Sequence, residues 1–243
     1  MNRRLGTGLW LAIGPQAATA IGFGLGQPWL LPILGAAVSY PVFLDRVRRG
    51  AFAAAFGWML FWTVFQSLSV GVGMQVAPER AARSVHRGPS YAAEMLHWAR
   101  TGEGAESDPS RFLPVHARHL AGFAVLTVVT AGAGGLILGT WLLDYMNYYV
   151  GSLTRASDQP LAAALLGWHP WAVLRVIGFI AIAVALAPLG LALLARLRRR
   201  PPPPGPLVAR RFLALGLALV AADAVLKTVL APTWQGILAG ILS

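Results

Sequence analysis

The chain has 243 residues, of which 56% are hydrophobic and only 12% charged, and its formal net charge is +11. A soluble domain carries about 25% charged residues, so this composition excludes an ordinary soluble fold and predicts an all-α, polytopic integral membrane protein. The length suits about six transmembrane or membrane-embedded helices. The absence of cysteine excludes disulfides, thiolate metal ligands and thiol catalysis.

Six apolar segments, taken in chain order, are expected to form these helices. The first two are separated by the turn sequence GQPW at 26–29, which predicts a helical hairpin. The chain starts with Arg3 and Arg4 followed by an apolar run that mimics a signal peptide, but Pro15 interrupts the run, so we expect a retained membrane segment. The six segments span residues 8–25, 28–44, 51–74, 117–143, 171–195 and 207–231.

The fourth segment creates a conflict in topology. Basic residues flank the apolar segments at 3–4, 46–49, 196–200 and 210–211, and the positive-inside rule favours placing such residues on the cytoplasmic side. Six full crossings do not put all four groups on one side. A re-entrant fourth segment that turns back within the membrane at AGAGG (131–135) would resolve the conflict, provided that protein or a water-filled cavity shields the turn. The sequence leaves both this choice and the orientation of the termini open.

Two connections differ from the apolar segments, although we interpret 1–243 as a single helical membrane domain. Residues 75–116 are expected to form a polar extramembrane connection with a short interfacial helix near 90–100, and residues 196–206 form a basic, proline-rich linker stiffened by polyproline II. Because basic residues cluster at the ends of apolar runs, the expected partner is the lipid bilayer and not nucleic acid.

Nineteen of the twenty basic residues are arginine, and alanine and glycine are abundant. This bias indicates a GC-rich bacterial genome, and hence the bacterial cytoplasmic (inner) membrane.

The polar stretch 91–119 contains four of the nine acidic residues and three of the five histidines. Glu94 and His97 are spaced i, i+3, as are His116 and His119, so in a helix each pair shares a face. One hypothesis is therefore a transition-metal site built from these four residues, with zinc, copper or iron as the bound ion.

Two other interpretations of the same stretch stay open. Residues 91–100 are also typical of an amphipathic helix at the membrane surface, with Tyr91, Met95 and Trp98 facing lipid. In a third interpretation the histidines serve in substrate binding or proton relay without a metal, since the pKa of imidazole lies near neutrality.

A second polar cluster, DYMNYYVGSLTR at 144–155, follows the fourth segment. Asp144 and Asn147 share a helix face and, with Tyr148, form a candidate ligand cluster. The alternative is an interfacial aromatic belt, which produces tyrosine clusters without any binding function. WHPW at 168–171 is likewise interpreted as an interfacial anchor.

Three charged residues fall inside apolar segments. Asp223 and Lys227 are spaced i, i+4 near the middle of the last segment, which predicts that they pair, and Arg175 lies about one turn into the fifth. A charge at this depth costs about 2.5–3.5 kcal/mol or more, so such residues face a partner or water. We expect Asp223 and Lys227 to point toward the fifth segment or another protein surface, with Arg175 as a third member of the group.

The sequence contains no HExxH, GxSG, DxxD or Walker motif, which favours a protein without its own catalytic centre. The first functional hypothesis is therefore a transporter-like unit or a membrane subunit of a larger complex, with other membrane subunits or copies of itself as partners. The alternative is a membrane-embedded metalloenzyme that uses the Glu94, His97, His116 and His119 cluster.

Overall fold

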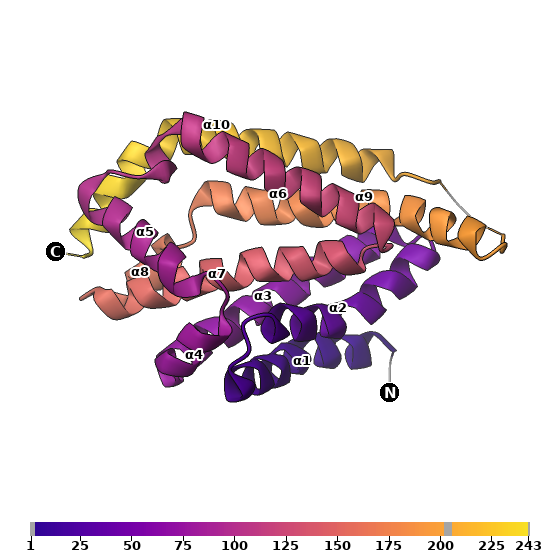
Figure 1. Cartoon of the computed structure of the whole chain (residues 1–243), viewed down its shortest axis with the longest axis horizontal. Coiled ribbons are helices and arrows are strands. Elements are labelled where there is room, and N and C mark those ends of the chain that lie inside the picture. The colour runs from indigo at the N-terminus through magenta and orange to yellow at the C-terminus, as the bar shows by residue number, and fades with distance from the viewer. Residues whose placement is uncertain (1–2, 202–205, 243) are drawn as a thin grey trace.

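The structure is a computed structural model that describes residues 3–201 and 206–242, and these residues form an all-helical bundle (Figure 1). The helices in chain order are α1 (Arg3–Leu25), α2 (Leu30–Arg48), α3 (Phe52–Val76), α4 (Pro78–Ser84), α5 (Gly88–Thr101), the 3₁₀ turn η1 (Ala105–Ser107), α6 (Pro109–Val129), α7 (Ala133–Ala156), α8 (Pro160–Leu166), α9 (Pro170–Leu197) and α10 (Arg210–Gly240).

Six of these helices are long and apolar enough to cross a membrane: α1, α2, α3, α6, α9 and α10. Their outer faces carry large aliphatic side chains that are more than half exposed, among them Val64, Val72, Val225 and Val229. Such a surface suits lipid and not water. The prediction of an all-α, multi-pass membrane protein is therefore confirmed.

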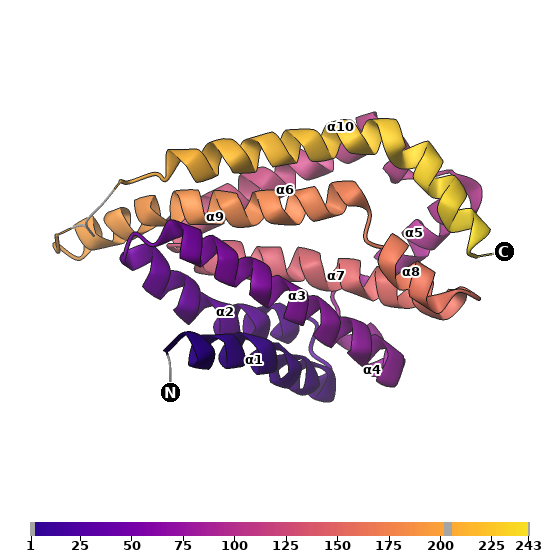
Figure 2. The ribbon, with the colours of Figure 1, turned by 180° about the vertical axis from the view of Figure 1, so that it is seen from behind.

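The expected fourth segment is two helices and not one. The chain leaves α6 at Val129, turns through residues 130–132 and enters α7, which runs back along the bundle (Figures 1 and 2). Gly132 makes the turn possible because its φ is +99° and a Cβ there would overlap the Phe43 ring. The reversal falls close to the expected 131–135, but a helix of 24 residues follows it instead of a short re-entrant loop.

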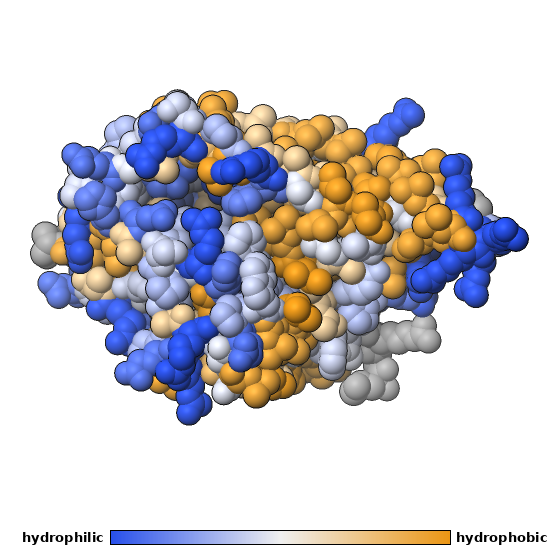
Figure 3. Space-filling view, in the orientation of Figure 1, coloured by the Kyte–Doolittle hydropathy of each residue, from blue (hydrophilic) through white to orange (hydrophobic). Residues whose placement is uncertain are grey.

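The seventh long helix brings the basic groups together. With α7 included, the start of α1, the α2–α3 connection, the end of α9 and the start of α10 all lie at one end of the bundle, which we call the basic end (Figure 1). Figure 3 shows hydrophilic residues at both ends of the molecule and an apolar region between them. The topological conflict in the sequence therefore disappears. Of the proline-rich linker, residues 202–205 lie outside the described residues.

At the opposite end α4, α5, η1 and α8 form what we call the cap (Figures 1 and 2). Below it α7 and α9 occupy the centre of the bundle, and α10 packs along α9. Gly178 of α9 and Gly216 of α10 allow this close approach, since a Cβ on Gly216 would lie 2.8 Å from the Gly178 carbonyl oxygen. The last turns of α10, beyond Pro232, reach the cap.

Candidate functional site

Helix α5 covers the cap end of the bundle and buries its apolar face in protein. Met95 and Trp98 are 2% and 1% exposed and pack in one cluster with Tyr149 of α7 and Leu238 of α10. The expectation that Met95 and Trp98 face lipid is therefore wrong, because α7 and α10 cover the face that the sequence pattern assigned to the membrane. The helix itself occupies the stretch for which the sequence predicts one.

Behind the cap, α9 and α10 share a buried ion pair. Arg175 donates two hydrogen bonds to Asp223, from Nε to Oδ2 and from Nη2 to Oδ1, each 2.9 Å long. The Asp223 side chain has no exposed surface, and His116 Nδ1 lies 3.5 Å from its Oδ2 atom. A bidentate guanidinium–carboxylate pair satisfies both oxygens of a buried aspartate, so Asp223 needs no other cation.

Lys227 has a different partner. Its Nζ donates a 2.8 Å hydrogen bond to Glu106 Oε1 in η1 and lies 4.3 Å from the centre of the Phe112 ring. The sequence paired Lys227 with Asp223, but the structure pairs each with a residue outside α10. The reason is that η1 folds back onto α10 and supplies a carboxylate 121 residues away in the sequence.

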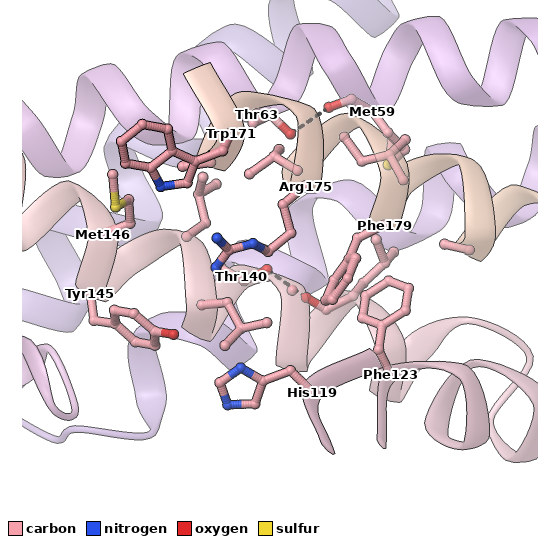
Figure 4. Close-up of a pocket in the computed structure, with 18 of the residues that line it drawn as sticks. Met59, Thr63, His119, Phe123, Thr140, Tyr145, Met146, Trp171, Arg175 and Phe179 are labelled. Carbon is pink, nitrogen blue, oxygen red and sulfur yellow. Dashed lines mark hydrogen bonds between the residues drawn. The ribbon is translucent and has the colours of Figure 1, made fainter. Parts of the chain in front are cut away.

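The Arg175 side chain also lines an internal cavity of about 90 Å³ between α3, α6, α7, α9 and the cap, which has room for several water molecules. Figure 4 shows the guanidinium in the space between Tyr145, His119 and Thr140. Tyr91, Glu106 and His169 complete the polar side of this cavity, and aliphatic and aromatic side chains complete the other, including Met59, Phe123, Leu136, Phe179 and Ile180.

The polar side of the cavity is rich in hydrogen-bond donors. Arg175 uses two of its five N–H groups for Asp223, and its Nη1 atom makes no hydrogen bond to a described residue. The Tyr145 hydroxyl also lacks a partner within 3–201 and 206–242, and the Tyr91 hydroxyl makes only a 3.8 Å contact to the Met146 sulfur. A group with several acceptor oxygens, such as a carboxylate or a phosphate, matches this arrangement.

Three titratable groups of the cap face this region. Burial would raise the pKa of Glu106, but Lys227, followed by His169, more than offsets this and holds that pKa below its usual value. Burial lowers the pKa of His169 to about 4, against the opposing effect of Glu106. Burial also raises the pKa of Tyr91, and the negative charge of Glu106 adds to this. The site is therefore built for a charged Glu106, a neutral His169 and a neutral Tyr91 near pH 7.

His169 sits in an aromatic enclosure at the start of α9. Its ring stacks on Trp171 at 4.8 Å, and Trp98 and Trp234 approach it edge-on. Its Nε2 atom lies 3.3 Å from the Tyr149 hydroxyl, and the residue is 1% exposed. The interpretation of WHPW as an interfacial anchor therefore misses a buried histidine.

The cavity has two thin walls. On the cap side Tyr91 and Glu106 separate it from a surface groove that Glu94, His97 and Glu103 also line. On the membrane side Thr63 of α3 and Val176 of α9 separate it from an apolar groove of about 580 Å³ between α3, α7 and α9.

The four residues of the metal hypothesis lie in separate surroundings. His116 contacts Asp223, His119 lines the internal cavity, and Glu94 and His97 line the surface groove of the cap. Among the residues that the structure describes, no group of three or more histidine, aspartate and glutamate side chains is placed to hold a metal ion. The structure therefore does not assemble Glu94, His97, His116 and His119 into one centre.

Asp144 and Asn147 of α7 are 1% and 2% exposed, so they lie inside the bundle and not at an interface. Gln66 of α3 donates a 2.9 Å hydrogen bond to Asp144 Oδ1, while Asp144 Oδ2 and Asn147 Nδ2 have no partner among the described residues. Tyr148 is also buried, under the Gly88 end of α5. This group joins α3 to α7 and lies apart from the Arg175 cavity, which it does not line.

Sequence reasoning missed most of the cavity, including four of its titratable residues: Tyr91, Glu106, Tyr145 and His169. The acid-rich stretch that contains Glu106 was a signal, because a carboxylate was needed for Lys227. No protein-family model, no curated protein and no solved structure matches the chain. Any function must therefore be argued from the cavity itself.

Proposed function

We propose that this multi-pass membrane protein is a transporter-like unit that binds an acceptor-rich group, a carboxylate or a phosphate, at Arg175. The observation that carries the proposal is the guanidinium edge opposite Asp223, which has no hydrogen-bond partner within residues 3–201 and 206–242 and lines the cavity. Arginine binds carboxylates and phosphates through paired N–H groups, and low polarity around the pair strengthens the interaction. Tyr145 and Tyr91 add hydroxyl donors on the same side.

The ion pairs favour this function over an obligatory membrane subunit. Charges inside apolar segments first suggested another protein chain, but Asp223 and Lys227 both find partners within this one. Within the apolar part of α10 that the structure describes, residues 212–240, this pairing leaves no unmatched charge for a second subunit to neutralise.

We also propose that the basic end is cytoplasmic and the cap extracytoplasmic, in a bacterial inner membrane. Eleven arginines at 3–4, 46–49, 196–200 and 210–211 support this orientation through the positive-inside rule. Glu103→Cys and Arg48→Cys, both at exposed positions, test it in a chain without native cysteine. In intact cells an impermeant maleimide should label only the first, and labelling of only the second would reverse the orientation.

Binding is tested by thermal unfolding of the purified protein in lipid nanodiscs with acetate or inorganic phosphate, against chloride at equal ionic strength. A ligand at 100 times its Kd stabilises by about 2.7 kcal/mol, which raises Tm measurably. Arg175→Gln alone would leave Asp223 without a cation, so the test variant is the double Arg175→Gln/Asp223→Asn. Arg118→Gln, which replaces an exposed arginine on α6, is the control for losing an arginine away from the cavity.

We expect the oxyanions to stabilise the wild type and the Arg118→Gln control but not the double variant. An equal Tm shift in all three proteins, or none in the wild type with either anion, would overturn the proposed site.

A further inference from the structure

We infer that the ligand of this cavity is a single-chain anionic amphiphile taken from the bilayer, with its head at Arg175 and its chain in the apolar groove between α3 and α9. This inference rests on the proposed function and names the substrate class.

The wall between the cavity and the groove is thin and has no charge. Thr63 of α3 and Val176 of α9 line both spaces, so only these two side chains are shared between them. Val176 follows Arg175 directly in α9. Arg175 lines the cavity as well, about 8 Å of helix rise from the cap-side start of α9.

The charges around the cavity favour access from the membrane over access from the cap. The surface groove of the cap is lined by three carboxylates, Glu94, Glu103 and Glu106, against one arginine, Arg111. An anion crossing that side would approach these carboxylates and would then have to pass the Glu106–Lys227 pair. The groove on the membrane side contains no charged side chain, so it does not repel an anionic head.

The groove suits a hydrocarbon chain. It is lined mainly by aliphatic side chains, and Val64, Leu68 and Val72 on α3 are more than half exposed, so it is open to lipid. From Thr63 it follows α3 toward the cap as far as Gln75, for about 18 Å. The cavity of about 90 Å³ is too small for a long chain but accommodates a head group, while the groove of about 580 Å³ takes the rest.

Gly71 allows the groove to be tested without disturbing the fold. A Cβ at Gly71 meets no atom within 4 Å, and the residue lines the groove. Gly57, on the same helix, has equally open surroundings but lies outside the groove. Phenylalanine at the first position should therefore fill the groove, whereas phenylalanine at the second meets only lipid.

The experiment uses the full chain in phosphatidylcholine nanodiscs and two photoreactive palmitate probes, one with its diazirine near the carboxylate and one near the methyl end. The first probe should label cavity residues such as Tyr145 and Phe179, and the second should label groove residues such as Leu68 and Trp168, as located by mass spectrometry. Excess palmitate should remove the labels, and dodecyl phosphate in a parallel arm shows whether a phosphate head competes as well as a carboxylate.

Gly71→Phe and Arg175→Gln/Asp223→Asn should each reduce labelling about tenfold or more, the scale expected for losing the chain site or the charge-assisted hydrogen bonds. Gly57→Phe and Arg118→Gln should leave it within about twofold. Equal labelling in Gly71→Phe and Gly57→Phe, or identical residues labelled by both probes, would overturn the inference. If acetate or phosphate still stabilised the protein through Arg175, the proposed function would stand even though the amphiphile inference had failed. If no anion stabilised the protein, the proposed function and the amphiphile inference would both be wrong.

Discussion

The basic end and the cap contain similar numbers of charged residues but use them differently. At the basic end eleven arginines have one carboxylate beside them, Asp45, and most of them are exposed. Residues 77–111 of the cap and its border hold five arginines and five acidic residues, so their charges balance. The first arrangement suits attraction to an anionic surface, whereas the second leaves carboxylates free for specific contacts.

The difference is clearest in the depth of the contacts. Asp45 bonds Arg49 one turn away on the surface, with 42% and 58% of the side chains exposed. Glu106 reaches inward to Lys227, whose side chain is 1% exposed. In the proposed orientation, charges at the basic end hold that end on the cytoplasmic side, while Glu106 and Lys227 form a buried ion pair beside the cavity. Under the proposed function, the same residue types serve topology at one end and a binding site at the other.

The largest expected effect comes from removing one member of a buried pair. Asp223→Ala leaves Arg175 uncompensated beside the cavity and should cost about 3–5 kcal/mol of unfolding free energy. Asp45→Ala at the basic end removes an exposed pair and should cost at most about 1 kcal/mol. Both are measured by denaturant unfolding in detergent. Losses of equal size would show that the two ends do not differ as described.

Acid should destabilise the cap through His169. Because burial lowers its pKa in the folded protein to about 4, the unfolded chain takes up the proton first as pH falls through about 6.5. Stability is therefore fully present above pH 6.5 and decreases toward pH 4, by on the order of 3 kcal/mol.

His169→Gln should reduce the slope of unfolding free energy against pH in this window, whatever its effect at neutral pH. Tyr149, Glu106, Lys227 and Arg175 surround or act on the ring and remain in the variant, so the difference in slope isolates His169. The basic end has no histidine that would mask the effect. Parallel pH profiles for wild type and variant would contradict the assignment.

A double-mutant cycle then separates the two ion pairs. Glu106→Gln with Lys227→Met should show a coupling energy of about 0.5–3 kcal/mol, since the two side chains share one hydrogen bond. Asp223→Asn with Lys227→Met should show a smaller coupling, because each residue has its own partner. Thermal or denaturant unfolding of the single and double variants provides both values. A larger coupling for Asp223 and Lys227 would restore the pairing inferred from their i, i+4 spacing.

Much of the fold follows from the sequence because helices that face lipid are recognisable as long apolar segments. Five of the six predicted segments correspond to one long helix each, and the class is confirmed. Helix α7 was not predicted at its full length because Asp144, Asn147 and three tyrosines end the apolar pattern at residue 143. Surrounding helices bury these side chains, and the composition of the segment itself does not reveal that burial.

The site was less accessible to sequence reasoning because its contacts are distant in the chain. Arg175, Asp223 and Lys227 stand out individually, since a charge in an apolar run is costly. Their partners depend on how η1 and α9 approach α10, across 121 residues for Glu106 and 48 for Arg175. The i, i+4 spacing favoured Asp223 as the partner of Lys227, and i, i+3 spacing grouped four candidate metal ligands that the fold separates.

The smallest expected effect concerns how the helices begin. Asp108, at the border of the cap, accepts a 2.9 Å hydrogen bond from the Ser110 backbone N–H and so caps α6, whereas Ala51 and Ala209, which precede α3 and α10 at the basic end, provide no side-chain cap. Asp108→Ala should therefore cause a small loss of stability and faster hydrogen exchange in the first turn of α6, while Asp108→Asn, which can keep the bond, should cause less. Ala51→Asp at the basic end should slow hydrogen exchange at the start of α3 only if the lack of a side-chain cap is what limits the stability of its first turn. Hydrogen exchange is measured by mass spectrometry on the three variants. An unchanged exchange rate in the first turn of α6 in Asp108→Ala would mean that packing against α10 and the cap, and not the aspartate, holds the chain where it enters the bundle.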